Sequence, residues 1–147
     1  MFIDVKTAHL NGFLGEDDHA FIQLPNEVKH EGKCGSLRRW LYGMRPAASA
    51  WEKDYSDKLA ALGFKKGVAA PTVFFCEEKN VRCVVHGDDF TFMGEKEGLM
   101  SVAKALQGVY ELKIRAVLGD ESEDDKEITI SKSEVDLESR LYRIRGG

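Results

Sequence analysis

The sequence predicts a mixed α+β fold in the order β-α-β-β-α-β, which is the ferredoxin-like arrangement. Two segments, residues 46 to 62 and 95 to 107, place apolar residues at helical spacing. Apolar runs of strand length lie before, between and after them. With 147 residues, of which 43% are hydrophobic and 31% charged, the chain has the length and composition of one globular domain with a sizeable core.

The chain begins with one predicted strand and a long irregular segment. Phe2–Val5 has the character of a strand end, although Asp4 interrupts its apolar run. Residues 13 to 40 mix glycine, proline and charge, with one short extended piece at residues 20 to 24. We therefore expect regular structure to resume only at the first helix.

The first predicted helix, residues 46 to 62, has a clear start and end. Pro46 suits a first helical turn, and Gly63 suits a helix end. One apolar stripe runs along the helix and is more typical of a buried core than of a base-stacking platform. The stripe consists of Trp51, Tyr55, Leu59 and Leu62.

Strands surround the second predicted helix, which covers residues 95 to 107 and stops at Gly108. Alternation of apolar and charged residues identifies the half-exposed strand that follows this helix. We expect the two helices to cover one face of the sheet and a metal site to lie on the other. The strands predicted in this half lie at residues 72–77, 81–86, 89–93, 109–117 and 127–131.

Two adjacent carboxylates, Asp88 and Asp89, lie in a predicted hairpin turn, where Gly87 supplies backbone freedom. Neighbouring carboxylates repel each other unless a cation or hydrogen bonds compensate, and Mg²⁺ prefers carboxylate oxygens. An ordinary acidic turn is the alternative, since Asp and Gly are common turn residues. Asp4, at the edge of a buried strand, also needs a partner, unless it is a helix N-cap or an exposed terminal residue.

Four motifs resemble copia-type retrotransposon reverse transcriptases, in the order found in that family. They cover most of residues 3 to 119, which is far more specific than any single motif. DVKTAHLNG at residues 4–12 resembles DVKTAFLNG, and LYGMRPAASAW at residues 41–51 resembles LYGLKQAPRAW. LGFK at residues 62–65, followed by APTVF at residues 70–74, is similar to LGFK and DPSLF, and HGDD at residues 86–89 stands where the family has YVDD.

The resemblance implies the palm of an RNA-directed DNA polymerase that uses Mg²⁺, or Mn²⁺ in its place. Nucleotidyl transfer needs one ion on the attacking 3′-oxygen and one on the triphosphate. By position, Asp4 and Asp88 hold these ions, Asp89 supports the site, and Val5 belongs to the same metal site. The implied partners are an RNA or DNA template-primer and a deoxynucleoside triphosphate.

The same resemblance assigns further site residues. Two arginines are expected to approach phosphate or template backbone, although a role in surface solvation is equally compatible with the sequence. These are Arg38 and Arg39. The residues expected to bind the nucleotide are Ala8, His9, Tyr42, Gly43 and Arg45.

Several positions depart from the family motifs without removing a metal ligand. His9 replaces the aromatic residue that normally lies under the incoming sugar, so discrimination between deoxyribo- and ribonucleotides is expected to change. His86 and Gly87 replace Tyr and Val, which makes the hairpin more flexible and less well packed. Pro46 and Ala48 replace Gln and Pro, which alters contacts of the nucleotide pocket.

The resemblance also implies a division of the chain. Residues 13–40 correspond to a remnant of the fingers, residues 41–119 to the palm, residues 120–127 to a solvated acidic loop, and residues 128–147 to a strand and a tail. Only three residues precede Asp4, and the thumb and RNase H regions are missing. The isolated fragment is therefore expected to be weakly active or inactive.

The three cysteines, Cys34, Cys76 and Cys83, form no disulfide framework and predict a reducing, intracellular location in the cytoplasm or nucleus. One interpretation places the last two opposite each other across a hairpin, and the favoured alternative is two semi-buried thiols of a reducing compartment. With the turn at residues 79–80, Glu77 would pair with Arg82. No signal peptide and no apolar run near 18 residues is present, so no membrane span is predicted.

Three functions remain from the sequence. The first is a copia-type polymerase palm, the second a folded transposon relic that does not polymerise, and the third a ferredoxin-like nucleic-acid-binding module. The net charge of −4 argues against strong non-specific nucleic-acid binding. The aromatic run of sheet-based RNA-binding modules is absent, so the third function ranks last.

Overall fold

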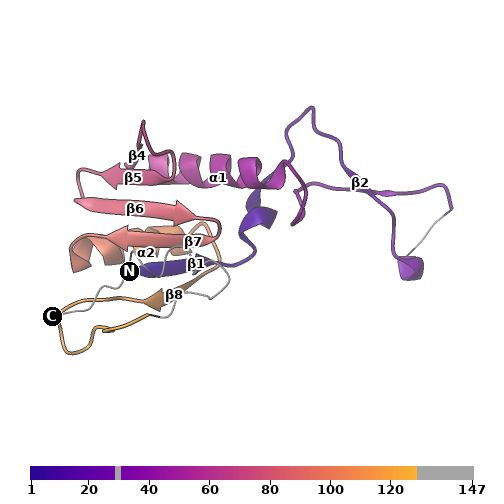
Figure 1. Cartoon of the computed structure of the whole chain (residues 1–147). Helices are drawn as coiled ribbons and strands as arrows, with labels where there is room; N and C mark the ends of the chain where they lie inside the picture. Colours follow the sequence, from indigo (N-terminus) through magenta and orange to yellow (C-terminus); the bar gives the residue numbers. More distant parts are fainter. Residues whose placement is uncertain (29–30, 129–147) are drawn as a thin grey trace.

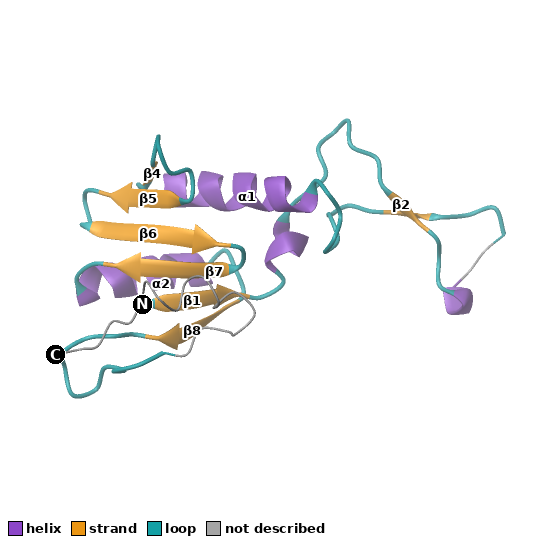
Figure 2. Ribbon diagram, viewed as in Figure 1, coloured by secondary structure: helices purple, strands orange, loops and turns teal. Residues whose placement is uncertain are grey.

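The structure, a computed structural model, describes residues 1–28 and 31–128. Two α-helices flank a run of four consecutive strands, and two short 3-10 helices lie in the first third of the chain (Figures 1 and 2). In chain order the elements are β1 (Phe2–Val5), η1 (Ala8–Asn11), β2 (Phe21–Ile22), η2 (Asn26–Val28), β3 (Gly35–Ser36), α1 (Ala47–Ala61), β4 (Lys65–Lys66), β5 (Val73–Cys76), β6 (Val81–His86), β7 (Asp89–Met93), α2 (Lys96–Gln107) and β8 (Leu112–Ala116).

A six-stranded sheet of order β4-β5-β6-β7-β1-β8 forms the main body of the described chain. Every neighbouring pair in it is antiparallel. The first strand in sequence, β1, thus lies between the two strands β7 and β8, which come from the far end of the described chain (Figure 1). This placement brings the N-terminal motif beside the hairpin that joins β6 to β7.

Both helices pack on one face of the sheet, as the sequence predicts. Residues that alternate along the strands, such as Ile3, Phe90 and Phe92, meet the buried stripes of α1 and α2 in one hydrophobic core. Among the described residues, the fully buried ones are all hydrophobic. The buried helix residues are Ala47, Trp51, Tyr55 and Leu59 of α1, with Leu99, Val102, Ala103 and Leu106 of α2.

The predicted helices and the three strands between them are confirmed, with bounds moved by one or two residues. The predicted register of the first hairpin is wrong: Cys76 pairs with Val81, and Cys83 pairs with Phe74. The loop spans four residues, 77 to 80, and Asn80 accommodates a positive φ of 47° there. Both thiols are nevertheless fully buried on the helix-covered face.

Three other strand predictions change at their ends. The strand after α2 begins at Leu112 instead of residue 109, because the backbone N–H groups of Val109 and Tyr110 donate to the Leu106 carbonyl and prolong the helix end. The extended piece predicted at residues 20–24 is the two-residue strand β2. Residues 127 and 128 form no strand, and the rest of the strand predicted at 127–131 lies outside the described residues.

Residues 13–28 and 31–40 form an arm that extends away from the sheet (Figure 2). Its only regular pairing among the described residues is the two-stranded ladder of β2 and β3. Phe21 is 62% exposed, whereas Ala20 and Trp40 are buried at the base of the arm against the start of α1. None of the helices in the described ranges is long and apolar enough to cross a membrane.

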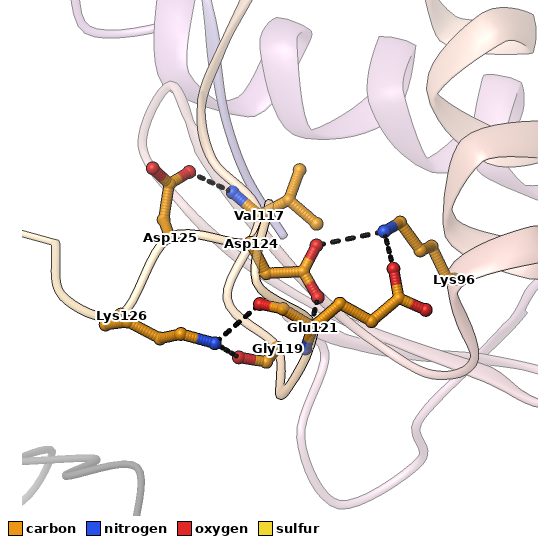
Figure 3. A network of polar contacts seen from close by, with 7 residues as sticks. All are labelled: Lys96, Val117, Gly119, Glu121, Asp124, Asp125 and Lys126. Carbon is orange, nitrogen blue, oxygen red and sulfur yellow. Dashed lines mark hydrogen bonds and ion pairs between the residues drawn. The ribbon is translucent and has the colours of Figure 1, made fainter.

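The acidic segment after β8 is folded back onto the start of α2 (Figure 3). The Lys96 ammonium lies between Glu121 and the Asp124 carboxylate, which it reaches at 3.0 Å. Lys126 donates to the carbonyls of Gly119 and Glu121 at 2.8 and 2.7 Å. The two lysines therefore offset part of the negative charge of this exposed turn, which the sequence predicted as a solvated loop.

Candidate active site

Strands β1 and β7 lie side by side (Figure 1), and their register places Asp4 directly opposite Asp89. Backbone hydrogen bonds join Met1 to Phe92 at one end of this ladder and Val5 to Asp88 at the other. Hydrogen-bonded and non-hydrogen-bonded pairs alternate in antiparallel ladders, so Asp4 and Asp89 form a non-hydrogen-bonded pair. The Cα atoms of such a pair are roughly 4.5 Å apart, and the side chains stand on the same face of the sheet.

The third carboxylate, Asp88, lies in the turn of the hairpin formed by residues 86–89, here called the carboxylate hairpin. His86 and Asp89 are its last paired residues, which leaves Gly87 and Asp88 as a two-residue loop. Gly87 has a φ of +61°, as the first loop position of a type II′ turn requires. The backbone N–H of Val5 donates to the Asp88 carbonyl at 3.0 Å, so β1 is tied to the turn itself.

Two cations of β8 flank the opposed carboxylates. Lys113 lies directly opposite Asp4 on the other side of β1. Arg115 Nη1 is 3.5 Å from Asp89 Oδ1, and both side chains are about one-third exposed. Like charges directly opposite in a sheet are destabilising, and these cations offset part of that repulsion.

The carboxylate hairpin is also bonded to α1. Trp51 Nε1 donates a 2.7 Å hydrogen bond to the carbonyl oxygen of Gly87. The indole is 2% exposed and makes edge-to-face contacts with Tyr55, Phe90 and Tyr110. Burial raises the pKa of Tyr55 to about 12. The sequence placed Trp51 in the core but gave no signal of its bond to the turn.

The first two sequence motifs contact each other beside this site. Gly12 lies so close to α1 that a Cβ there would be 2.8 Å from the Cβ of Ala50. The His9 and Tyr42 rings meet edge to face with centroids 4.7 Å apart. Between Asp4 and His9, Thr7 adopts a left-handed conformation with φ of 50°, which is unusual for a β-branched residue.

The remaining predicted site residues lie around the arm and the start of α1. Ala8 is fully buried, whereas Gly43 and Arg45 are exposed in the segment that leads into α1. Arg38 is exposed. The guanidinium of Arg39 donates to the Leu10 carbonyl at 3.2 Å and stacks over the Phe13 ring, so this side chain already binds the first motif.

The donor set suits a metal that takes part of its shell from substrate. Among the described residues, no three His, Cys, Asp or Glu side chains form a ready metal-binding group. Mg²⁺ is usually held by one or two carboxylates together with substrate phosphates, not by an all-protein cage. Asp4, Asp88, Asp89 and Val5 are brought together by backbone pairing, and this arrangement fits the sharing of ions with a triphosphate.

Comparison with known proteins identifies the family of the chain. No solved structure matches the chain. Residues 1–126 match the family model described as "Reverse transcriptase (RNA-dependent DNA polymerase)", and this range contains every site residue discussed above. The match covers most of the sequence, and the chain belongs to this reverse transcriptase family.

Proposed function

We propose that this chain is the palm of a copia-type reverse transcriptase that transfers nucleotides with two Mg²⁺ ions. The observation that carries the proposal is the β1–β7 register, which opposes Asp4 to Asp89 and bonds Val5 to Asp88. In this proposal Asp4 and Asp88 hold the ions, and Val5 belongs to the same site. Asp89, which faces Arg115, supports the site.

The sheet topology supports the assignment to a palm. Strands β6, β7, β1 and β8 are adjacent in this order, and α1 and α2 pack on one face of them. Without the added strands β4 and β5, the order of the elements is compatible with the proposed β-α-β-β-α-β unit of ferredoxin-like type. Asp4 and Asp89 lie on the face that the helices leave open, where a primer end and a triphosphate have access, and Asp88 lies in the turn at its edge.

The residues of the chain divide the work of the reaction. When bound, Mg²⁺ activates the 3′-oxygen of the primer and neutralises charge on the triphosphate. Asp4 and Asp88 set the position of that chemistry through their fixed backbone pairing. The cations Lys113 and Arg115 hold the open face close to neutral until substrate arrives.

The nucleotide is proposed to lie where the first two motifs meet. The His9–Tyr42 pair is partly exposed and offers an aromatic contact for a sugar or base, and Arg45, three residues after Tyr42, is also exposed. Ala8 and Gly43 shape the same region. Arg38 and Arg39 are proposed to contact the template backbone, although the bond from Arg39 to Leu10 limits its reach.

Primer extension tests this proposal. Purified chain is incubated with a primed RNA or DNA template, deoxynucleotides and either Mg²⁺ or Mn²⁺, and Asp88→Asn is expected to lower extension at least roughly 100-fold. The matched control is Asp57→Asn, which removes an exposed carboxylate of α1 that pairs with Lys53. Extension that survives Asp88→Asn would overturn the assigned role.

A folded relic without polymerase activity is the second candidate. It is favoured by the Arg115–Asp89 ion pair, in which a side chain of the protein itself compensates a site carboxylate. His9, which replaces the Phe or Tyr of the family motif, also favours this second candidate. A chain that binds Mn²⁺ at Asp88 but extends no primer with either metal would support this second candidate.

A further inference from the structure

We propose that Trp51 is a positioning residue that holds the carboxylate hairpin in register with Asp4. The inference rests on the proposed function, since it concerns the geometry of the same carboxylates. Its basis is the 2.7 Å hydrogen bond from the Trp51 indole N–H to the Gly87 carbonyl. This bond reaches the residue directly before Asp88, across a separation of 36 positions in the sequence.

The hairpin needs an external anchor because its own turn is weakly constrained. Gly87 is exposed, and a Cβ added there would meet nothing within 4 Å. Glycine also has the largest range of backbone conformations, so ordering it costs the most conformational entropy. The carbonyl of this residue accepts the indole bond, which fixes one peptide plane of the two-residue loop.

Trp51 is suited to this role because its ring is buried and contacts other rings on several sides. The indole is 2% exposed, and its ring centroid is 5.2 Å from that of Tyr110 and 6.1 Å from that of Phe90. The Tyr110 hydroxyl in turn donates to Asp54 Oδ2 at 2.6 Å, which ties this cluster to α1. Phe90 follows Asp89 directly, so the indole contacts the hairpin on both sides of its carboxylates.

Two independent bonds therefore hold the turn. Val5 N–H donates to the Asp88 carbonyl from β1, and Trp51 donates to the Gly87 carbonyl from α1. Because α1 begins within the second motif, residues 41–51, the indole also links the proposed nucleotide pocket to the carboxylates. Residues that orient metal ligands in this way typically change metal affinity 10- to 100-fold when they are removed.

The test uses Trp51→Phe, which keeps an aromatic ring but removes the N–H donor. Amide hydrogen exchange of the metal-free chain is compared with wild type, and exchange at Val5 is expected to become faster because the hairpin loosens. The amide of Phe92, which donates to Met1 at the far end of the same ladder, is the internal control and is expected to stay unchanged. Unaltered exchange at Val5 would overturn the inference.

Metal affinity gives a second readout. Mn²⁺ binding, followed by electron paramagnetic resonance, is expected to weaken roughly 10-fold in Trp51→Phe. The matched variant Trp40→Phe changes the other tryptophan, which is buried at the base of the arm, and is expected to leave Mn²⁺ affinity unchanged. Equal Mn²⁺ affinity in wild type and Trp51→Phe would overturn the positioning role. Wild-type protein that takes up no Mn²⁺ would count against the proposed function. The exchange experiment would still test the positioning role of Trp51, because it is made without metal.

A third measurement covers the case in which Trp51→Phe does not fold. Trp40→Phe leaves Trp51 as the single tryptophan of the chain. Mg²⁺ is added because, unlike Mn²⁺, it is not paramagnetic and does not quench fluorescence. It is expected to shift the emission of the Trp51 indole, because the Gly87 carbonyl that this indole binds belongs to the proposed metal-binding turn. The shift is expected to disappear in Trp40→Phe combined with Asp88→Asn. Emission that Mg²⁺ does not change, in a protein that binds Mn²⁺ in the resonance experiment, would contradict the inference.

Discussion

The two faces of the sheet are built from the same strands for different purposes. In β1, Ile3 and Val5 are each 1% exposed against the helices, while Asp4 between them stands on the open face. In β7, Phe90 and Phe92 are buried in the same core, while Asp89 faces Arg115. The covered face supplies stability through apolar burial, and the open face concentrates charges that oppose folding until they are compensated. The stability of the core on the covered face thus compensates for the repulsion between carboxylates on the open face.

The largest expected effect is on the covered face. Phe92→Ala removes a fully buried ring that stacks on Phe90 and contacts Phe64, so it is expected to lower the free energy of unfolding by about 3–5 kcal/mol. Urea denaturation measures the change. The neighbouring Met93 is 49% exposed, and Met93→Ala is expected to change the free energy by less than about 0.5 kcal/mol. Similar losses for both variants would show that the two faces do not differ as described.

A smaller effect is expected on the open face. Arg115→Met removes the cation beside Asp89 and is expected to lower the free energy of unfolding by roughly 0.5 kcal/mol, because the pair is only partly shielded from water. The loss should shrink as salt is added and should vanish in an Asp89→Asn background. Arg82→Met, which removes a more distant cation that stacks on Phe75, is the control. An Arg115→Met effect that persists in Asp89→Asn would mean that this arginine acts on another group.

Long periodic segments were the parts of the fold that could be predicted from the sequence. The stripe of α1 from Trp51 to Leu59 and the stripe of α2 from Leu99 to Leu106 are both buried as expected. In contrast, β3 and β4 contain two residues each and carry no periodic signal. The Cys76 register failed because a shift of the turn centre by one residue moves every pair along the hairpin.

The carboxylates of the candidate site could be found by motif, but their surroundings could not. Asp4, Asp88 and Asp89 stand in local patterns that sequence alone displays. Arg115 reaches Asp89 only because β8 adds to the edge of the sheet beside β1, which is a non-local feature. The helical spacing of Trp51 predicts that it is buried in the core. Its hydrogen bond to Gly87 could not be predicted, because it depends on where α1 packs on the sheet. Sequence motifs thus identify the carboxylates of the candidate site, whereas the positions of Arg115 and Trp51 beside them depend on the sheet topology.

The smallest expected effect concerns charges that lie off both faces, between α2 and the acidic turn. The Lys96 ammonium lowers the pKa of Asp124 by a 3.0 Å hydrogen bond (Figure 3). In the unfolded chain the Asp124 carboxyl has its ordinary pKa of about 3.9. On acidification the unfolded state therefore takes up a proton at a higher pH than the folded state. The stabilisation is therefore fully present above about pH 4 and is lost as the pH falls through the lower pKa of the folded state.

Lys96→Met is expected to destabilise the chain slightly at pH 6 to 7, and the difference from wild type should narrow below pH 4. Urea denaturation at a series of pH values measures this difference. Lys104→Met, which removes an exposed lysine further along α2, is the matched control and is expected to show a smaller dependence on pH in this range. A difference between Lys96→Met and wild type that stays constant from pH 7 to pH 2 would show that Lys96 stabilises the turn by packing its aliphatic stem, not by its charge.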